Sequence, residues 1–241
     1  MSTMFDPIVE IVKREMVLFL LIDQSGSMYG TKIGAVNTAV REAIPELRDV
    51  GGSDASIKVA VLLFSNGCKW MYPEPIPIED FQWDTIEADG MTDLGVALSE
   101  LSSKMSKNSF LKSPSASVAP VIFLLSDGAP TDDYESGLQK LKENKWFKYA
   151  IKVAVAIGDD ADLSVLERFT GTKEGVILTH TPEALKKMIR FLTVTSSKIG
   201  SKSQVIVDGE AQTKQLVLNQ DIQDYLIDNP DIDQSSEDDW D

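Results

Sequence analysis

The chain contains one cysteine, one histidine and no long apolar run, and these shortages exclude several classes of protein. The single Cys68 cannot form an internal disulfide or a cysteine-rich zinc site, which is typical of a reducing compartment. No apolar run approaches the ~20 residues that a membrane-spanning helix needs. The N-terminus also lacks the basic segment and apolar stretch of a secretion signal. We therefore expect a cytoplasmic protein with no membrane partner.

Basic residues are also scarce, with 23 Lys and Arg against 38 Asp and Glu and a net charge of -15. Contacts with phosphates need clustered Lys and Arg, so we expect no nucleic-acid partner. Nine of the acidic residues lie between positions 221 and 241, where there is no basic residue. The sequence predicts a main domain over residues 1–196 and a distinct acidic C-terminal extension over residues 197–241.

Short apolar runs alternate with helical patterns along the main domain. The runs are rich in Val, Ile and Leu, which is typical of buried parallel strands; they cover residues 16–22, 56–65, 121–126, 151–158 and 175–178. Apolar residues recur at helical spacing over 33–47, 94–105 and 185–192, with weaker patterns over 133–144 and 162–169. The proline-rich segment 68–78 suits an edge strand antiparallel to 56–65. We therefore expect a doubly wound α/β fold with a mostly parallel sheet flanked by helices and one antiparallel edge strand.

The stretch "MVLFLLIDQSGSMYG" places polar side chains directly after an apolar strand. Residues two apart in an extended segment point to the same side, so Asp23, Ser25 and Ser27 converge. Carboxylate and hydroxyl oxygens suit magnesium, calcium or manganese rather than zinc or copper. A strand-end turn or a helix cap explains the same residues equally well.

Two further polar positions follow the same logic. Asp127, in "IFLLSDGAPTDD", comes after another strand, and Thr92, in "ADGMTDLGVAL", comes just before a helix. Ligands of such folds bind beyond the carboxyl ends of the strands, where the strand order reverses. Taken singly, Thr92 is more often a helix cap and Asp127 more often a turn former. The combination with Asp23 favours one shared site.

These three pieces resemble the von Willebrand factor A-type domain, over residues 16 to 196. That family carries a metal-ion-dependent adhesion site (MIDAS) with the pattern Asp-x-Ser-x-Ser, then a Thr, then an Asp after a central strand. Here the sequence reads Asp23-Gln24-Ser25-Gly26-Ser27, then Thr92, then Asp127. Within the family the chain is most similar to the stand-alone bacterial proteins of the tellurium-resistance (TerY-like) group. One departure is Met91, which stands where the family has a glycine before the threonine.

The resemblance implies Mg²⁺, with Mn²⁺ or Ca²⁺ as alternatives, held by Ser25, Ser27 and Thr92 with Asp23 and Asp127 close by, direct or through water. Neutral hydroxyl ligands leave part of the cation's charge uncompensated, so an acidic group of a partner can complete the coordination. The resemblance thus implies an adaptor or scaffold that binds a protein partner, in a stress-response or phage-defence system. A Ser/Thr kinase or phosphatase encoded alongside is one such partner.

A metal-assisted phosphohydrolase is the alternative function. Ser25 or Ser27 would act as a nucleophile, or a bound metal would activate water. A nucleophilic serine needs a general base, commonly a histidine. The only histidine, His180, is distant in sequence and better suits a helix start or a surface position. The sequence therefore favours binding over catalysis.

The C-terminal extension combines a hairpin signal at Asp208-Gly209 with an acidic segment that includes several apolar residues. One interpretation is a disordered tail that aids solubility. The other is a recognition segment that folds against a partner, or that offers Asp231 or Asp233 to the metal of its own or a neighbouring copy.

Overall fold

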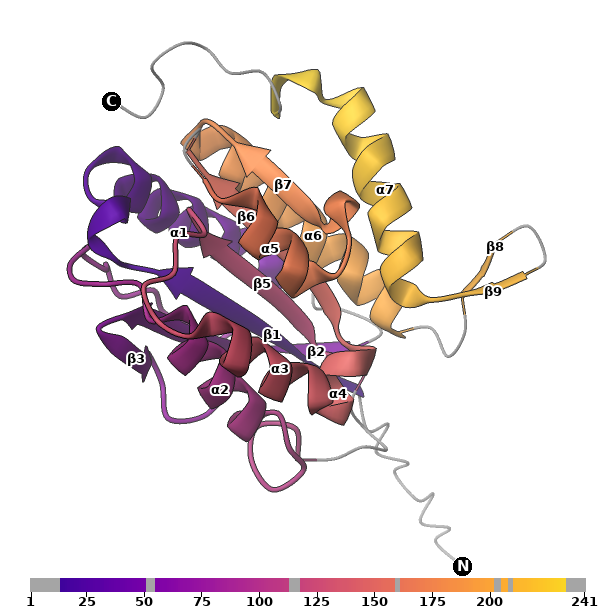
Figure 1. Cartoon of the computed structure of the whole chain (residues 1–241). Coiled ribbons are helices and arrows are strands. Elements are labelled where there is room, and N and C mark those ends of the chain that lie inside the picture. Colours follow the sequence, from indigo (N-terminus) through magenta and orange to yellow (C-terminus); the bar gives the residue numbers. More distant parts are fainter. Residues whose placement is uncertain are drawn as a thin grey trace, which may run out of the picture.

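A seven-stranded mixed β-sheet forms the centre of the molecule (Figure 1). The computed structural model describes residues 14–50, 55–112, 118–158, 161–201, 205–207 and 210–232. The strands are β1 (Arg14–Asp23), β2 (Ala55–Ser65), β3 (Gly67–Trp70), β4 (Ile76–Pro77), β5 (Val121–Ser126), β6 (Ile151–Ile157) and β7 (Val176–Thr179). Their order is β3-β2-β1-β5-β6-β7, with β4 also paired to β2. The strands β2, β1, β5, β6 and β7 are parallel, which confirms the predicted doubly wound fold.

Alternation along β1 builds a hydrophobic core on each face of the sheet. Leu18, Leu20 and Ile22 belong to one apolar cluster, whereas Phe19 and Leu21 belong to the other. Because successive side chains of a strand point to opposite faces, an all-apolar strand is buried on both sides. This explains why β1 reads as a continuous apolar run rather than an alternating one.

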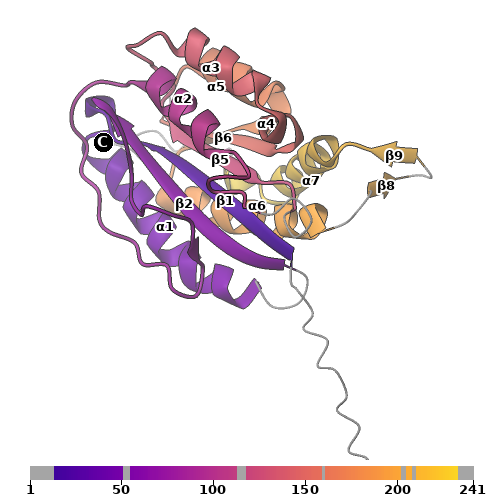
Figure 2. The ribbon, with the colours of Figure 1, turned by 90° about the horizontal axis from the view of Figure 1, so that it is seen from below.

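Helices cover both faces, as Figure 2 shows from below. The helices are α1 (Thr31–Val50), α2 (Leu94–Lys104), α3 (Tyr134–Glu143), α4 (Lys145–Tyr149), α5 (Leu163–Thr170) and α6 (Pro182–Ser201), with short 3-10 turns η1 (Gly26–Met28) and η2 (Lys173–Gly175). One face carries α1 and α6, which pack on each other, and the opposite face carries α2, α3, α4 and α5. All five predicted helices are present. The short α4 was not expected, since five residues are too few to show a period.

The predicted antiparallel edge consists of two pieces. Both β3 and β4 pair antiparallel with β2, at Leu62↔Trp70 and Val59↔Ile76. The segment between them starts with a bond from Met71 N to the Val61 carbonyl at 2.9 Å and then leaves the ladder. Pro73 and Pro75 lie there, and proline has no N–H for a ladder hydrogen bond.

The C-terminal region is a continuation of the fold. The boundary predicted between residues 196 and 197 falls inside α6, which runs on to Ser201. After it come the antiparallel pair β8 (Val205–Val207) and β9 (Glu210–Gln212), then α7 (Lys214–Asp228) and η3 (Pro230–Ile232). The hairpin prediction is thus confirmed by its strands, although Asp208 and Gly209 themselves lie outside the described residues.

Helix α7 packs against other elements of this chain. Leu218, Ile222 and, beyond the helix, Ile232 are buried in the same cluster as α1 and α6. The ring of Tyr225 stacks on that of Phe191 in α6, with centroids 3.9 Å apart. For residues 214–232 these contacts correct the interpretation of the C-terminal extension as a disordered, solubilising tail, because Leu218, Ile222 and Ile232 are part of the core.

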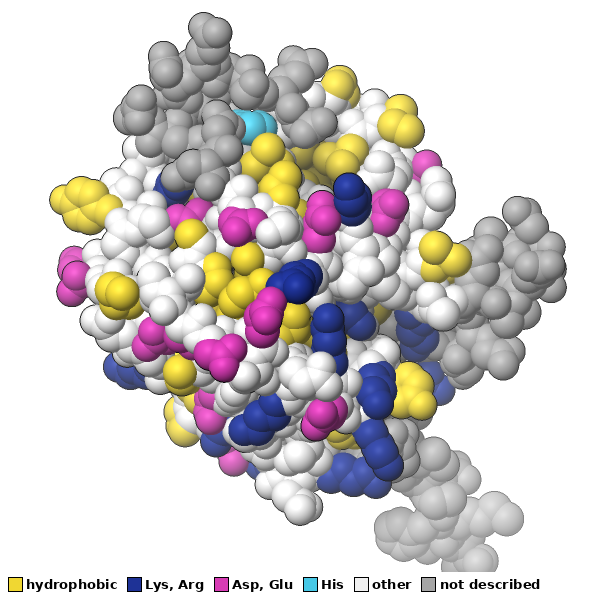
Figure 3. Space-filling model, viewed as in Figure 1, with side chains coloured by type: hydrophobic (Ala, Val, Ile, Leu, Met, Phe, Trp, Pro, Cys, Tyr) yellow, Lys and Arg dark blue, Asp and Glu magenta, His cyan; other side chains and the backbone are white. Residues whose placement is uncertain are grey.

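Charge is unevenly spread over the surface. Residues 139–152, from α3 to the start of β6, hold five lysines and one glutamate although the whole chain is strongly acidic. Figure 3 shows Lys and Arg side chains gathered over the lower part of the face in view.

Within the described ranges, no helix combines the length and the apolar character required to span a membrane.

Candidate metal centre

The strand order reverses at β1, and the predicted site residues lie at this point. The chain leaves β1 for β2 on one side and later returns to β5 on the other side. Asp23 is the last residue of β1, and Asp127 directly follows β5. Because β1 and β5 are parallel, their carboxyl ends meet at one edge of the sheet. The topology therefore brings both carboxylates to the crevice where ligands of this fold bind.

Asp23 is completely buried and held by two short hydrogen bonds. The Ser25 amide donates to Asp23 Oδ1 at 2.8 Å, and the Ser126 hydroxyl donates to Asp23 Oδ2 at 2.6 Å. Burial raises the pKa of Asp23 above its ordinary value, and the nearby Asp127 adds to the rise, although the hydrogen bonds from Ser126 and Ser25 oppose it. A carboxylate in this environment is stabilised by a nearby positive charge.

Ser25 and Ser27 form the turn that follows β1. Their hydroxyl oxygens lie 3.0 Å apart, so the two side chains meet as the alternation predicts. The turn is joined to the loop that carries Thr92, because Gly26 N donates to the Gly90 carbonyl at 2.9 Å. A second bond, from Asp89 N to the Gln24 carbonyl at 2.8 Å, fixes the same pair of loops.

Thr92 is buried between this turn and the loop after β5. Its N–H donates to Thr131 Oγ1 and its carbonyl accepts from Thr131 N, both at 2.9 Å. Gly90 has a φ of 85°, and a Cβ there would lie 2.6 Å from the Asn66 side chain, so only glycine fits. Met91, where the family has a glycine, turns its side chain to solvent and keeps its N–H on Asn66 Oδ1. The loop therefore tolerates the departure.

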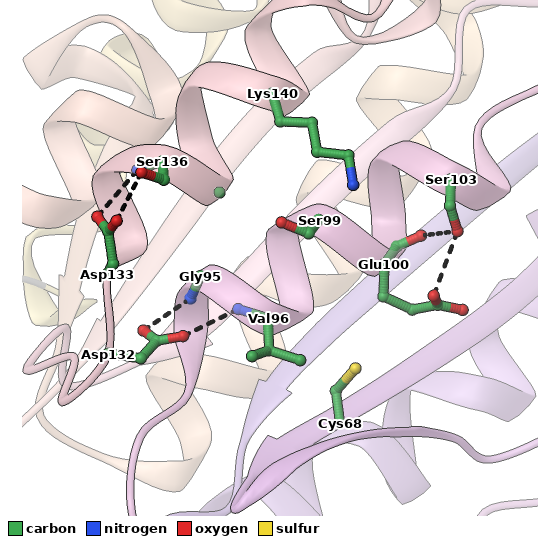
Figure 4. A pocket seen from close by; sticks show the side chains of 11 residues that line it. Cys68, Gly95, Val96, Ser99, Glu100, Ser103, Asp132, Asp133, Ser136 and Lys140 are labelled. Atoms are coloured by element: carbon green, nitrogen blue, oxygen red, sulfur yellow. Dashed lines mark hydrogen bonds between the residues drawn. The ribbon is translucent and has the colours of Figure 1, made fainter.

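The alternative role of Thr92 as a helix cap is not what the structure shows. The N–H groups of the second and third residues of α2, Gly95 and Val96, donate instead to the two carboxylate oxygens of Asp132, each at 2.9 Å (Figure 4). Asp132 belongs to the loop before α3. A residue from another loop thus caps α2, and this leaves the Thr92 side chain for the site.

Asp127 has one oxygen in an ion pair and one with no partner among the described residues. Lys32 Nζ lies 3.9 Å from Asp127 Oδ2. Asp127 Oδ1 is buried and accepts no hydrogen bond from any described group. Buried polar atoms are nearly always satisfied, so an unsatisfied carboxylate oxygen needs an explanation. A bound cation at this atom would provide one.

Sequence reasoning missed three residues that build the site, namely Ser126, Thr131 and Lys32. Ser126 links the two strand ends, since its hydroxyl donates to Asp23 and accepts from Gly128 N at 2.8 Å. Its position before Asp127 was a usable signal, because two polar residues end an apolar strand. The roles of Thr131 and Lys32 depend on contacts between segments distant in sequence and have no local signature.

The donor set consists of hard oxygens only. In the described part of the chain, no three His, Cys, Asp or Glu side chains are grouped to hold a metal. Two carboxylates and the hydroxyl-bearing residues Ser25, Ser27 and Thr92 lie on the strand ends and loops of this edge instead, a mixture that suits an oxygen-preferring cation such as Mg²⁺, Ca²⁺ or Mn²⁺. With the unsatisfied Asp127 Oδ1, these residues fit a divalent cation.

The fold and site together define an α/β domain with a candidate, oxygen-lined cation site at the carboxyl edge of its sheet. The chain belongs to the von Willebrand factor type A domain family, whose model matches residues 18–190. A search of curated proteins returned no match.

Solved structures share this fold at low sequence identity. A von Willebrand factor type A protein from Catenulispora acidiphila is 22% identical, with a TM-score of 0.57 and coverage of 80% of this chain and 44% of that one. The pilus adhesin SpaC from Lactobacillus rhamnosus GG is 13% identical, with a TM-score of 0.59 and coverage of 75% and 30%. Proximal thread matrix protein 1 from the mussel byssus, with a zinc-occupied MIDAS motif, is 18% identical, with a TM-score of 0.57 and coverage of 76% and 48%. The chain spans about half or less of the length of these proteins.

Proposed function

We propose that this chain is a non-enzymatic interaction module that binds a protein partner through a divalent cation. Ser25, Ser27 and Thr92 would hold the cation, with Asp23 and Asp127 close by. The observation that carries the proposal is the buried, unsatisfied Asp127 Oδ1. The family commonly mediates metal-dependent protein interactions, and the mussel protein of the same fold has a zinc-occupied MIDAS motif.

Mg²⁺ is the cation that we propose. Neighbouring ligands of an octahedral ion with bonds of about 2.1 Å are separated by about 3.0 Å. The hydroxyl oxygens of Ser25 and Ser27 are 3.0 Å apart, which supports such a pair of neighbouring positions. Mg²⁺ also usually keeps several waters of its own, one of which a carboxylate from outside can replace.

An acidic protein group is the ligand that we propose for the open side of the site. Bound at neutral hydroxyls, the cation would offer a coordination position to a carboxylate from outside. Tyr29 and Met91 are exposed apolar residues on the two loops that the Gly26–Gly90 hydrogen bond joins. Exposed apolar side chains beside a polar centre are typical of a protein-binding surface. They support a partner that presents a carboxylate among apolar residues.

The serine environment gives less support to a phosphohydrolase. Ser25 and Ser27 lie against each other, and no histidine donates to or accepts from either hydroxyl among the described residues. His180 is buried, two residues before α6, which agrees with the helix-start expectation and not with a surface position. A general base for these serines would therefore have to be a carboxylate of the site itself.

We also propose a more specific role for the chain within its family. The "DQSGSMYG" loop supports a TerY-like role in a stress-response or phage-defence system, alongside a Ser/Thr kinase or phosphatase. The single cysteine supports a cytoplasmic location.

Calorimetry with Mg²⁺ tests the proposal directly. The wild type should bind Mg²⁺ and gain about 2.7 kcal/mol of unfolding free energy at 100 times the dissociation constant. Asp23→Ala should lose both responses. Asp84→Ala, which removes an exposed aspartate elsewhere, is the matched control and should behave as the wild type. Equal Mg²⁺ binding by the wild type and Asp23→Ala would refute the site assignment, and phosphoester turnover that Asp23→Ala abolishes would favour the hydrolase.

A further inference from the structure

Lys32 lies at the candidate metal centre although it is not part of the five-residue pattern. It belongs to the first turn of α1, and its Nζ is 3.9 Å from Asp127 Oδ2. The side chains are only 12% and 3% exposed, respectively. The Lys32 side chain is therefore largely shielded from water, which is unusual for lysine unless the charge is paired.

The two aspartates of the centre are stabilised in different ways. Asp23 accepts from neutral donors at both of its oxygens, Ser25 N and Ser126 Oγ. The Asp127 carboxylate has no side-chain hydrogen bond from a neutral donor among the described residues, and the ion pair with Lys32 is the contact that it makes. Lys32 thus provides positive charge to a buried pair of carboxylates that otherwise repel each other.

In this geometry each oxygen of the Asp127 carboxylate has a different role. Oδ2 faces the ammonium group, and Oδ1 is the unsatisfied atom that a metal would use, directly or through water. The two oxygens of one carboxylate are about 2.2 Å apart, so both positive charges would lie within a few ångströms of each other. Charges this close and this buried are screened little by salt.

We infer that Lys32 is the built-in counter-ion of the metal-free centre and that it lowers the affinity of the centre for a divalent cation. This inference rests on the proposed function, because it concerns the same site. The ammonium group stabilises the carboxylates when no metal is bound and repels a metal that binds. A carboxylate from a partner would bring negative charge that offsets this repulsion, so partner and cation reinforce each other's binding.

Substitution by an uncharged side chain of similar length tests the inference. In Lys32→Met, Mg²⁺ binding measured by calorimetry at constant ionic strength should be roughly tenfold tighter than in the wild type. The thermal midpoint in chelator should fall, because one partner of a buried pair is lost. Lys32→Arg keeps the charge and should keep Mg²⁺ affinity within about threefold of the wild type.

Lys112→Met is the matched control for the change in net charge. Lys112 pairs with Glu74 in an exposed ion pair, so its loss should leave Mg²⁺ affinity and the midpoint in chelator nearly unchanged. An affinity of Lys32→Met equal to or weaker than that of the wild type overturns the inference, as does a midpoint in chelator no lower than that of Lys112→Met. A variant that stays unfolded in excess Mg²⁺ also overturns it, since a metal should replace the ammonium charge. A wild type that binds no divalent cation would instead defeat the proposed function.

Discussion

At the scale of single residues, burial among other oxygen atoms disfavours the ionised form of Asp23. Its raised pKa means that the folded chain binds a proton at this group more readily than the unfolded chain does. The contribution of Asp23 to the free energy of unfolding therefore declines as pH rises from the ordinary value of 3.8 through the raised folded value. The ionised Asp23 carboxylate is unfavourable in this buried position, and a cation bound beside it would stabilise it.

Cys68 is the only thiol of the chain, and its surroundings suppress its ionisation. Burial, followed by the charges of Glu100 and Asp93, raises its pKa from 9.0 to about 11. The thiol lines a groove of about 640 Å³ beside α2 and α3, and Lys140 lines the same groove (Figure 4). Only the thiolate reacts readily, so the groove should hold an unreactive cysteine.

We predict that iodoacetamide alkylates Cys68 at pH 8 about 100-fold more slowly in the folded protein than in denaturant, because the two pKa values differ by about two units. Mass spectrometry of the alkylated fraction over time measures both rates. Raising the pH toward 11 should accelerate the folded reaction. Equal rates at pH 8 would show that the thiol is not suppressed.

At the scale of elements, the crossing of α2 and α3 depends on two glycines. A Cβ on Gly95 would lie 2.5 Å from the Asp133 carbonyl oxygen, and a Cβ on Gly137 would overlap the Gly95 carbonyl oxygen. The close approach allows Asp132 to reach the N–H groups of Gly95 and Val96. Since α2 begins two residues after Thr92, this packing also fixes one side of the candidate metal centre.

Gly137→Ala should destabilise the protein by about 2 kcal/mol or more, because backbone atoms of two helices must separate. Gly34→Ala is the matched control. Gly34 is an exposed helical glycine with open space around it, so alanine there should add up to about 1 kcal/mol through helix propensity. Urea unfolding followed by circular dichroism measures both changes. A Gly137→Ala variant as stable as the wild type would contradict the close crossing.

At the scale of the whole molecule, the C-terminal helix α7 completes one layer of the fold. It contacts α6, β6 and η2. Gln215 bonds to both backbone groups of Lys152, at 2.8 Å and 3.0 Å, where β6 extends beyond its pairing with β7. A side chain thus takes the place of a neighbouring strand. Asp231 pairs with Lys187 of α6 rather than reaching the candidate metal centre, while Asp233 lies outside the described residues.

Two isoleucines of α7 test whether this helix is part of the fold. Ile222 is 0% exposed and Ile227 is 75% exposed. Ile222→Ala should cost about 2–5 kcal/mol of unfolding free energy, and Ile227→Ala should stay within about 0.5 kcal/mol of the wild type. Chemical denaturation gives both values. Similar small effects would mean that α7 is not docked in solution.

Much of the architecture follows from local sequence. Apolar runs of four to ten residues with alternating helical patterns determine the strands, the helices and the parallel sheet, because burial on both faces imposes these periods. The convergence of Ser25 and Ser27 follows equally from the two-residue period of an extended chain. Thr92 and Asp127 were joined to Asp23 by the rule that ligands bind beyond the carboxyl ends of parallel strands, and the resemblance to a family supported the grouping. The metal-binding roles of all five residues stay predictions.

Other features of the molecule depend on contacts between distant segments. The Asp132 cap on α2, the Ser126 bridge and the Lys32–Asp127 pair join residues that are 36, 103 and about 95 positions apart. The docking of α7 is decided in the same way, because its acidic composition resembles a solvated tail until α6 and β6 provide an apolar surface. The sequence by itself determined the periodic elements and their order, since burial acts on each segment locally. Only the tertiary structure decided which polar groups are paired and which carboxylate oxygen stays open, since that depends on side chains from separate loops meeting at one point.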